Sequence, residues 1–236
     1  MKKIENRKSK IENAGAFTLV ELLVVMAIIG VLAAFIIPIM GSLKRREYIS
    51  KTQAEMAQVE TAIDGYKNTY NFYPPGNANA TPANLAPTLV NPLYYELTGT
   101  TNTITAGTDT YYPLDGSANI STNTMAAAFG VIGFVNCSTG SGEDARVAKN
   151  FLTGLRSTQI GTDGGPGVQM LIGSVGGPDQ NYQPLGQQDL NPWRYLYPGV
   201  NNPNGYDLWI QLVIKGQTNL ICNWSSQVQI NNNQMP

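Results

Sequence analysis

The chain has 236 residues, of which 42% are hydrophobic and 13% are charged, and its formal net charge is −1. This is enough apolar sequence for one or two packed domains, and the charge balance excludes a basic nucleic-acid-binding surface. Histidine is absent, so the commonest general base and transition-metal ligand are missing. The acidic residues are scattered and suggest no catalytic constellation. We therefore expect neither an enzyme nor a resident cofactor.

The first 40 residues divide into a basic leader, 1–16, and an apolar run, 17–40. The leader holds five Lys/Arg and two Glu, which leaves ten basic and fourteen acidic residues in the rest of the chain. The apolar run has 24 residues and one charge, Glu21. As a helix it would be about 36 Å long, enough to cross a bilayer with the basic leader in the cytoplasm. A cleavable secretory signal is the alternative, although its apolar core is normally shorter and has no Glu.

The junction of these two segments carries a motif. Gly15-Ala16, then Phe17-Thr18-Leu19-Val20-Glu21 and an apolar helix, resemble the class III signal of type IV pilins and type II secretion pseudopilins. The resemblance implies that a prepilin peptidase cuts between Ala16 and Phe17 and methylates the new amino terminus. The family usually has glycine directly before the cut, so a cut after Gly15 is the alternative. Gly30 and Pro38 stand where pilins commonly carry a glycine and a helix-loosening proline.

Glu21 is the single charge of the apolar run. A carboxylate in a membrane helix is costly and by default marks function, the alternative being that it reaches the membrane interface. The resemblance implies that Glu21 pairs with the free amino terminus of Phe17 in a neighbouring subunit, which would offset the desolvation of both charges. It also implies three partners: prepilin peptidase, other pilin or pseudopilin subunits, and an inner-membrane assembly platform. The chain would cross the inner membrane once, with its head in the periplasm or at the cell surface.

The segment 41–70 changes from uniformly apolar to amphipathic. Six hydrophobic residues and one threonine recur at steps of three and four, as on one face of a helix: Ile49, Thr52, Met56, Val59, Ile63, Tyr66 and Tyr70. We predict one helix from about residue 17 to about residue 68, whose second half packs on a globular head, 71–236. A free-standing coiled coil is the alternative. Two prolines and a glycine at 74–76 end the helix.

The middle of the chain is less regular. We expect a short helix at 91–97, a long loop or ragged β-hairpin at 98–124, and an apolar strand or buried turn at 126–135. Residues 143–156 have the apolar spacing of a second helix, with Ser141 as its N-cap. Residues 168–175 are predicted to form a strand. The segment 62–75 resembles the end of the first helix in major pseudopilins, whereas 98–188 has no counterpart there and is interpreted as an insertion.

The tail returns to the pseudopilin pattern. Residues 191–199 resemble the Asp-Pro-Trp strand of the type II major pseudopilin, 206–209 its next strand, and 223–224 a late Asn-Trp pair. Large residues alternate within 193–197 and 208–214, which predicts a sheet with one face against the helix. The predicted fold class is α+β, a pilin-like fold with a long amino-terminal helix packed on an antiparallel sheet.

Neither a metal site nor a cysteine pair is settled by this pattern. In the major pseudopilin, the loop after the strand that 206–209 resembles holds calcium. The corresponding residues here, 215–219, are Lys-Gly-Gln-Thr-Asn and include no carboxylate, so we do not predict a calcium site at this loop. Asp163-Gly164-Gly165 and Asp179-Gln180-Asn181 are interpreted as turns. Cys137 and Cys222 either form one disulfide in an oxidising compartment or remain two buried thiols.

The sequence therefore favours a structural subunit of a type II secretion pseudopilus or a type IV pilus-like filament. A pilin-anchored binding or adhesion module, whose head insertion recognises a substrate or a surface such as polysaccharide, is the alternative. A third hypothesis is a membrane-anchored protein that never polymerises.

Overall fold

The computed structural model describes residues 17–105, 108–139, 145–165, 167–173 and 182–230, except for the side chains of 35–42, 105 and 108. The chain divides into two compact units between Lys44 and Arg45. The described part of the first unit lies mostly in helix α1, and the second unit forms the head. The elements are α1 (Leu19–Tyr70), η1 (Ala86–Leu89), α2 (Leu93–Thr98), β1 (Thr100–Thr105), β2 (Thr108–Pro113), β3 (Ile120–Ser121), α3 (Thr122–Phe129), β4 (Cys137–Ser138), η2 (Ser157–Gln159), β5 (Ile160–Thr162), β6 (Gln169–Leu171), β7 (Arg194–Leu196), β8 (Asp207–Ile214), β9 (Gln217–Cys222) and β10 (Ser225–Ile230).

Helix α1 matches the predicted helix to within two residues at each end. In the head, its predicted face is buried at Thr52, Val59, Ile63 and Tyr66 and half-buried at Ile49, Met56 and Tyr70. Ile63 and Tyr66 are completely inaccessible to solvent. The helix ends at Asn71, which has a φ of 66° and whose N–H donates to the Lys67 carbonyl at 2.7 Å. Asparagine tolerates this left-handed conformation, which closes a helix carboxyl end before the prolines.

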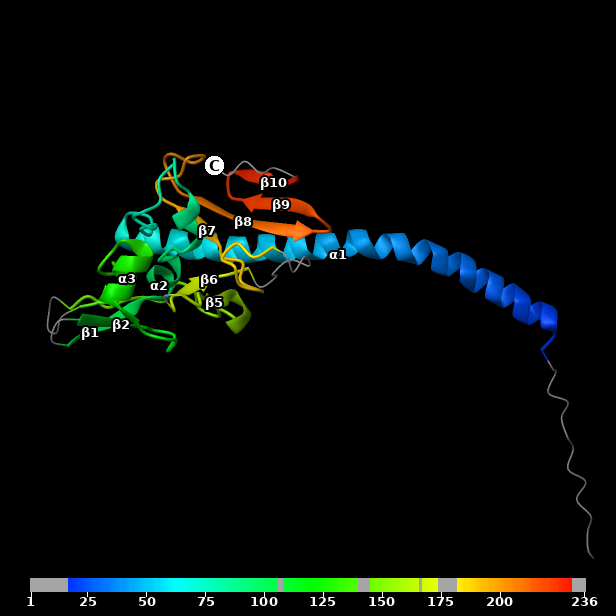
Figure 1. Ribbon diagram of the computed structural model, residues 1–236, viewed down its shortest axis with the longest axis horizontal. Helices are drawn as coiled ribbons and strands as arrows, with labels where there is room; N and C mark the ends of the chain where they lie inside the picture. The colour runs from blue at the N-terminus through cyan, green and yellow to red at the C-terminus, as the bar shows by residue number, and fades with distance from the viewer. Residues whose placement is uncertain (1–16, 106–107, 140–144, 166, 174–181, 231–236) are drawn as a thin grey trace, which may run out of the picture. The chain divides into compact units, whose positions relative to one another are not determined.

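The carboxyl-terminal sheet has the antiparallel strand order β10-β9-β8-β7. Strand β8 runs beside the head part of α1 (Figure 1). Four alternate β8 residues belong to the same core cluster as Val59, Ile63 and Tyr66 of the helix: Leu208, Ile210, Leu212 and Ile214. The predicted packing of one sheet face against the helix is therefore confirmed. Trp209, which points to the opposite face, belongs to a second, smaller cluster.

The middle of the chain forms a second sheet with the order β3-β2-β1-β4 and a separate β5-β6 pair. β1 and β2 make the hairpin predicted within 98–124. Helix α2 confirms the short helix predicted at 91–97, and all six of its residues are buried. An isolated bridge between Ile172 and Pro192 joins the end of β6 to the start of β7. The middle segment and the tail thus share one hydrophobic core.

Two predictions about the middle segment were wrong. Residues 122–129 form helix α3, where an apolar strand or turn was expected from 126 onward. Its amino end is capped by Ser121, whose hydroxyl accepts from the Thr124 N–H at 3.2 Å, and Gly130 closes it with a φ of 71°. The cap at Ser121 and the left-handed Gly130 favour a helix at 122–129, although the short apolar run had suggested a strand or a turn.

The second error is the helix at 143–156, since the described part, 145–156, is not helical. Arg146 pairs its backbone with Thr139, and the Asn136 side chain binds both the N–H and the carbonyl of Lys149. These partners take backbone groups that a helix would have used, so tertiary contacts override the local apolar spacing. The expected N-cap, Ser141, lies outside the described residues.

Candidate functional site

The amino end of α1 is organised by Thr18 and Glu21. The N–H and the hydroxyl of Thr18 both donate to Oε2 of Glu21 at 2.8 Å, and the Glu21 N–H donates to Oγ1 of Thr18 at 3.2 Å. This reciprocal arrangement is a capping box, which satisfies backbone donors that a helix start otherwise leaves free. In the single chain, therefore, the Glu21 carboxylate is already bound by its own helix.

The residues that follow present apolar side chains to solvent. Every residue from 17 to 34 is exposed, and Phe17 and Leu19 each have 79% of their side chains accessible. An exposed apolar surface of this extent marks a protein or membrane contact. Within the described residues, no helix combines the length and the hydropathy that crossing a bilayer requires. The predicted span, 17–40, continues into residues whose side chains lie outside this description.

Of the other residues predicted to be functional in this segment, the structure describes only Gly30 in full. Gly15 and Ala16, which precede the expected cut before Phe17, lie outside the described residues, and the side chain of Pro38 does too. Gly30 lies in α1, and a Cβ added there would meet nothing within 4 Å. Among the described residues, therefore, no contact demands glycine at this position. Its expected role in loosening the helix, together with Pro38, remains a prediction.

In the head, the buried carboxylate of Glu96 connects three segments. Its two oxygens accept from the Val135 N–H at 2.9 Å, the Asn136 N–H at 3.0 Å and the Tyr66 hydroxyl at 3.0 Å. Glu96 is 1% exposed, and burial raises its pKa while the three donors act in the opposite direction. Since Tyr66 lies in α1 and Glu96 in α2, this carboxylate fixes the helix to the segment before β4.

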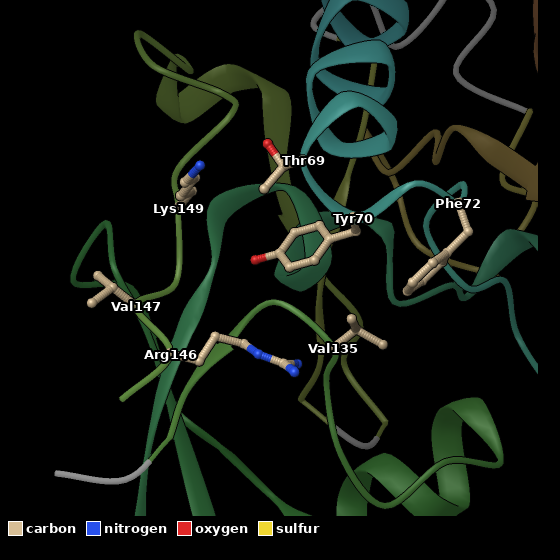
Figure 2. A pocket seen from close by; sticks show the side chains of 7 residues that line it. All are labelled: Thr69, Tyr70, Phe72, Val135, Arg146, Val147 and Lys149. Atoms are coloured by element: carbon tan, nitrogen blue, oxygen red, sulfur yellow. The ribbon is translucent and has the colours of Figure 1, made fainter. Parts of the chain in front are cut away.

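Beside this network lies an open pocket of about 440 Å³ at the carboxyl end of α1. Two of its lining residues are cations and two are aromatic, and Figure 2 shows the Arg146 guanidinium pointing in beside the Tyr70 ring. Burial raises the pKa of Tyr70, and the nearby Arg146 charge opposes that increase. The described residues that line the pocket are Thr69, Tyr70, Phe72, Val135, Arg146, Val147 and Lys149.

A metal ion is held by a cluster of side chains that donate ligands to it. The described residues contain no group of three or more Cys, Asp or Glu that could hold an ion. At the β8–β9 turn, Lys215 and Gly216 have φ values of 52° and 73°, and the nearby Asn219 Oδ1 accepts two hydrogen bonds from Arg45. With no carboxylate and its amide oxygen occupied, this turn does not fit calcium. Asp163 lies in a turn as expected, accepting from the Gly165 N–H at 3.3 Å, and 179–181 lie outside the described residues.

The two cysteines are free thiols in the structure, and both are buried. Cys137 lies in β4 and belongs to the main core cluster, whereas Cys222 lies in β9 and belongs to the smaller one. Of the two alternatives left open by the sequence, the structure thus has separate buried thiols. Burial raises the pKa of each.

Sequence reasoning missed the Glu96 network and the pocket. A glutamate inside the run Leu93-Tyr94-Tyr95-Glu96-Leu97 is a signal for a buried carboxylate, because every neighbour in that run is large and mostly apolar. The pocket offers no such signal. Its lining comes from segments near 70, 135 and 147, which only the fold brings together.

Comparison with known proteins defines the class to which the amino-terminal segment points. The prokaryotic N-terminal methylation motif matches residues 13–37. The chain thus carries the class III signal that its Gly-Ala-Phe junction and Glu21 suggested.

Within that class, the chain is similar to the type II secretion system core protein G of several bacteria. It is 37% identical over 73 residues to that of Escherichia coli strain K12, which covers 31% of this chain and 50% of the relative. It is 38% identical over 58 residues to the Pectobacterium carotovorum protein, which covers 25% of this chain and 37% of the relative. It is 34% identical over 65 residues to the Vibrio cholerae protein, which covers 28% of this chain and 44% of the relative. The chain thus spans half or less of the length of these relatives. No solved structure matches it.

Proposed function

We propose that the protein is a structural subunit of a type II secretion pseudopilus or a type IV pilus-like filament. The observation that supports this proposal most strongly is the methylation motif followed by an exposed apolar helix segment, 17–34, whose one charge is Glu21. Such a segment needs a bilayer before assembly and neighbouring helices afterwards. The similarity to core protein G supports the secretion branch.

In this proposal, prepilin peptidase removes residues 1–16 and methylates Phe17. The subunit crosses the inner membrane once, with its head outside the cytoplasm, until an assembly platform adds it to the filament. Glu21 then exchanges its internal partner, Thr18, for the amino terminus of a neighbouring Phe17. The capping box holds the carboxylate near the helix start, where such an amine would arrive.

The mass and amino-terminal sequence of membrane-extracted protein, with and without a prepilin peptidase, test the processing step. We expect a methylated Phe17 only when the peptidase is present. An intact Met1, or a cut beyond residue 38, would contradict the filament proposal and leave a tethered or secreted head.

Two substitutions separate pairing from capping. Glu21→Gln keeps a side chain that suits a capping box but removes the charge, whereas Thr18→Ala removes the cap and keeps the charge. We expect Glu21→Gln to lose most filament assembly, measured as sheared filament per cell, while Thr18→Ala assembles at half the normal amount or more. If the two variants assembled equally, the proposed amine pairing would be rejected.

A binding or adhesion module carried on the same helix is the second candidate function. It is supported by the head pocket, because that pocket is lined by charged and aromatic side chains. Its ligand is considered next.

A further inference from the structure

The head pocket combines positive charge with an aromatic wall. Arg146 and Lys149 lie three residues apart on the segment after β4, and their described neighbours in the lining include no carboxylate. Neither side chain forms a hydrogen bond or an ion pair with another described residue, and both residues are exposed. Two cations in the lining of one pocket, with no carboxylate among its described lining residues, favour the binding of an anion.

The backbone that carries the two cations is fixed, although their side chains form no hydrogen bond with another described residue. Arg146 exchanges two backbone hydrogen bonds of 3.0 Å with Thr139. Lys149 donates its N–H to Oδ1 of buried Asn136 at 2.9 Å and accepts from Nδ2 of the same residue at 2.6 Å. Because both anchors lie outside the pocket and hold the backbone, only the two exposed side chains have to be ordered when a ligand binds.

The aromatic wall is equally well supported. Tyr70 donates its hydroxyl to Asn136 at 2.8 Å, and its ring lies 4.6 Å from Tyr66 and 6.2 Å from Phe151 between centroids. Phe72 stands at the pocket edge with 41% of its side chain exposed. An exposed aromatic ring beside a fixed one offers an apolar surface against which a ring-shaped ligand can lie.

We propose that this pocket binds a carboxylate carried on a ring, as in the uronate units of acidic polysaccharides. The Arg146 guanidinium takes the carboxylate through two parallel N–H donors, Lys149 adds a second charge, and the Tyr70 and Phe72 rings contact the body of the sugar. This inference deepens the binding-module candidate, and it requires no filament assembly.

Size and chemistry favour this class over other anions. About 440 Å³ accommodates one or two small rings, which matches the lower range of small-molecule sites. An inorganic anion would use the cations but leave Phe72 and Val147 uncovered. A peptide carboxyl terminus would satisfy the charge, and it is therefore an outcome that the experiment must distinguish.

The test is calorimetric titration of the full chain in detergent micelles with galacturonate, and with galactose as the neutral match. We expect saturable binding of galacturonate and at least tenfold weaker binding of galactose. Arg146→Gln and Lys149→Gln are each expected to weaken binding about tenfold, because each removes a charge-assisted hydrogen bond. Phe72→Ala should weaken it several-fold, and added salt should weaken it further.

Two matched variants control for general effects. Lys215→Gln removes an exposed charge at the β8–β9 turn, and Ile132→Ala removes an apolar side chain that is 73% exposed, so both should bind normally. Equal affinity for galactose, equal affinity for sulfate, or preference for a short peptide with a free carboxyl terminus would each overturn the proposal. Normal binding by Arg146→Gln would overturn the assignment of this pocket. Filament assembly is measured separately, so failure here leaves the structural function standing.

Discussion

At the scale of single residues, the head depends on one buried carboxylate. Glu96 has three donors arranged around its two oxygens, so neither oxygen is left unsatisfied. Removing one acceptor from such a group leaves a buried N–H without a partner, which is more costly than the hydrogen bond is worth. The same burial makes the ionised form unfavourable relative to an unfolded chain, which raises the pKa of the carboxyl group.

Glu96→Gln should therefore change both the stability and its dependence on pH. A glutamine places an NH₂ group opposite a backbone N–H, and we expect a loss of about 1–3 kcal/mol in the free energy of unfolding. In the native protein the raised pKa means that the folded state binds a proton more tightly than the unfolded state. Stability contributed by this group is present below the unfolded pKa and falls as the pH rises through the folded pKa.

Urea unfolding of both proteins at several pH values from 4 upward measures this effect. The difference between the wild type and Glu96→Gln should shrink as the pH rises above 4.5, the ordinary value of the carboxyl group. Glu47→Gln, at an exposed position of α1, is the matched control, because it removes a carboxylate that lies outside this buried network. Parallel profiles for the wild type and Glu96→Gln would show that the burial of Glu96 does not affect its titration.

At the scale of elements, the backbone between α2 and β1 lies close to the segment that contains Lys149. Gly99 follows the last residue of α2 with a φ of 76°, and a Cβ there would lie 2.8 Å from the Lys149 carbonyl and 3.2 Å from Nδ2 of Asn136. Gly116 has nearly the same φ, 78°, but nothing within 4 Å. Both glycines have a positive φ, but Gly99 combines it with a ψ of 155°, a region that glycine almost alone adopts, and with a close approach of neighbouring atoms.

We expect Gly116→Ala to lower the free energy of unfolding by about 1 kcal/mol, which is the conformational cost alone. Gly99→Ala should lower it by about 2–4 kcal/mol, because the Asn136 contact with Lys149 must also move. Thermal unfolding followed by circular dichroism gives both values. Similar losses in the two variants would mean that the segment around Lys149 can shift without cost.

Sequence periodicity predicted the elements whose partners are local or whose pattern is long. The α1 stripe and the alternation in β8 each repeat many times, so their faces are determined before the fold is known. The helix predicted at 143–156 was wrong because Asn136 and Thr139 bind the backbone of this segment. Such a contact between distant residues leaves no periodic pattern in the sequence. The amino-terminal motif is contiguous and could be found, whereas the pocket assembles from three separate segments and could not.

At the scale of the whole molecule, the two units meet different physical demands. Residues 17–34 have no core of their own and are exposed throughout, while the second unit buries its apolar residues in two clusters. The smaller cluster, on the sheet face away from α1, holds Cys222 with Leu196, Trp209 and Leu220. Cys137 lies in the larger cluster, on a different sheet. A disulfide between them would have to join two separate parts of the core.

We therefore expect two free thiols even in protein taken from an oxidising compartment. Alkylation with iodoacetamide, without reductant, should add no group to the native protein and two groups in denaturant, as counted by intact mass. Burial accounts for the native protection in two ways, since it blocks access and raises the pKa of each thiol, which lowers the fraction of reactive thiolate. Raising the pH to 9 should thus increase the alkylation rate in denaturant far more than in the native state.

As controls, Cys137→Ala and Cys222→Ala should each add one group in denaturant. A denatured protein that takes up alkyl groups only after reduction would instead demonstrate a Cys137–Cys222 bond and a rearranged head.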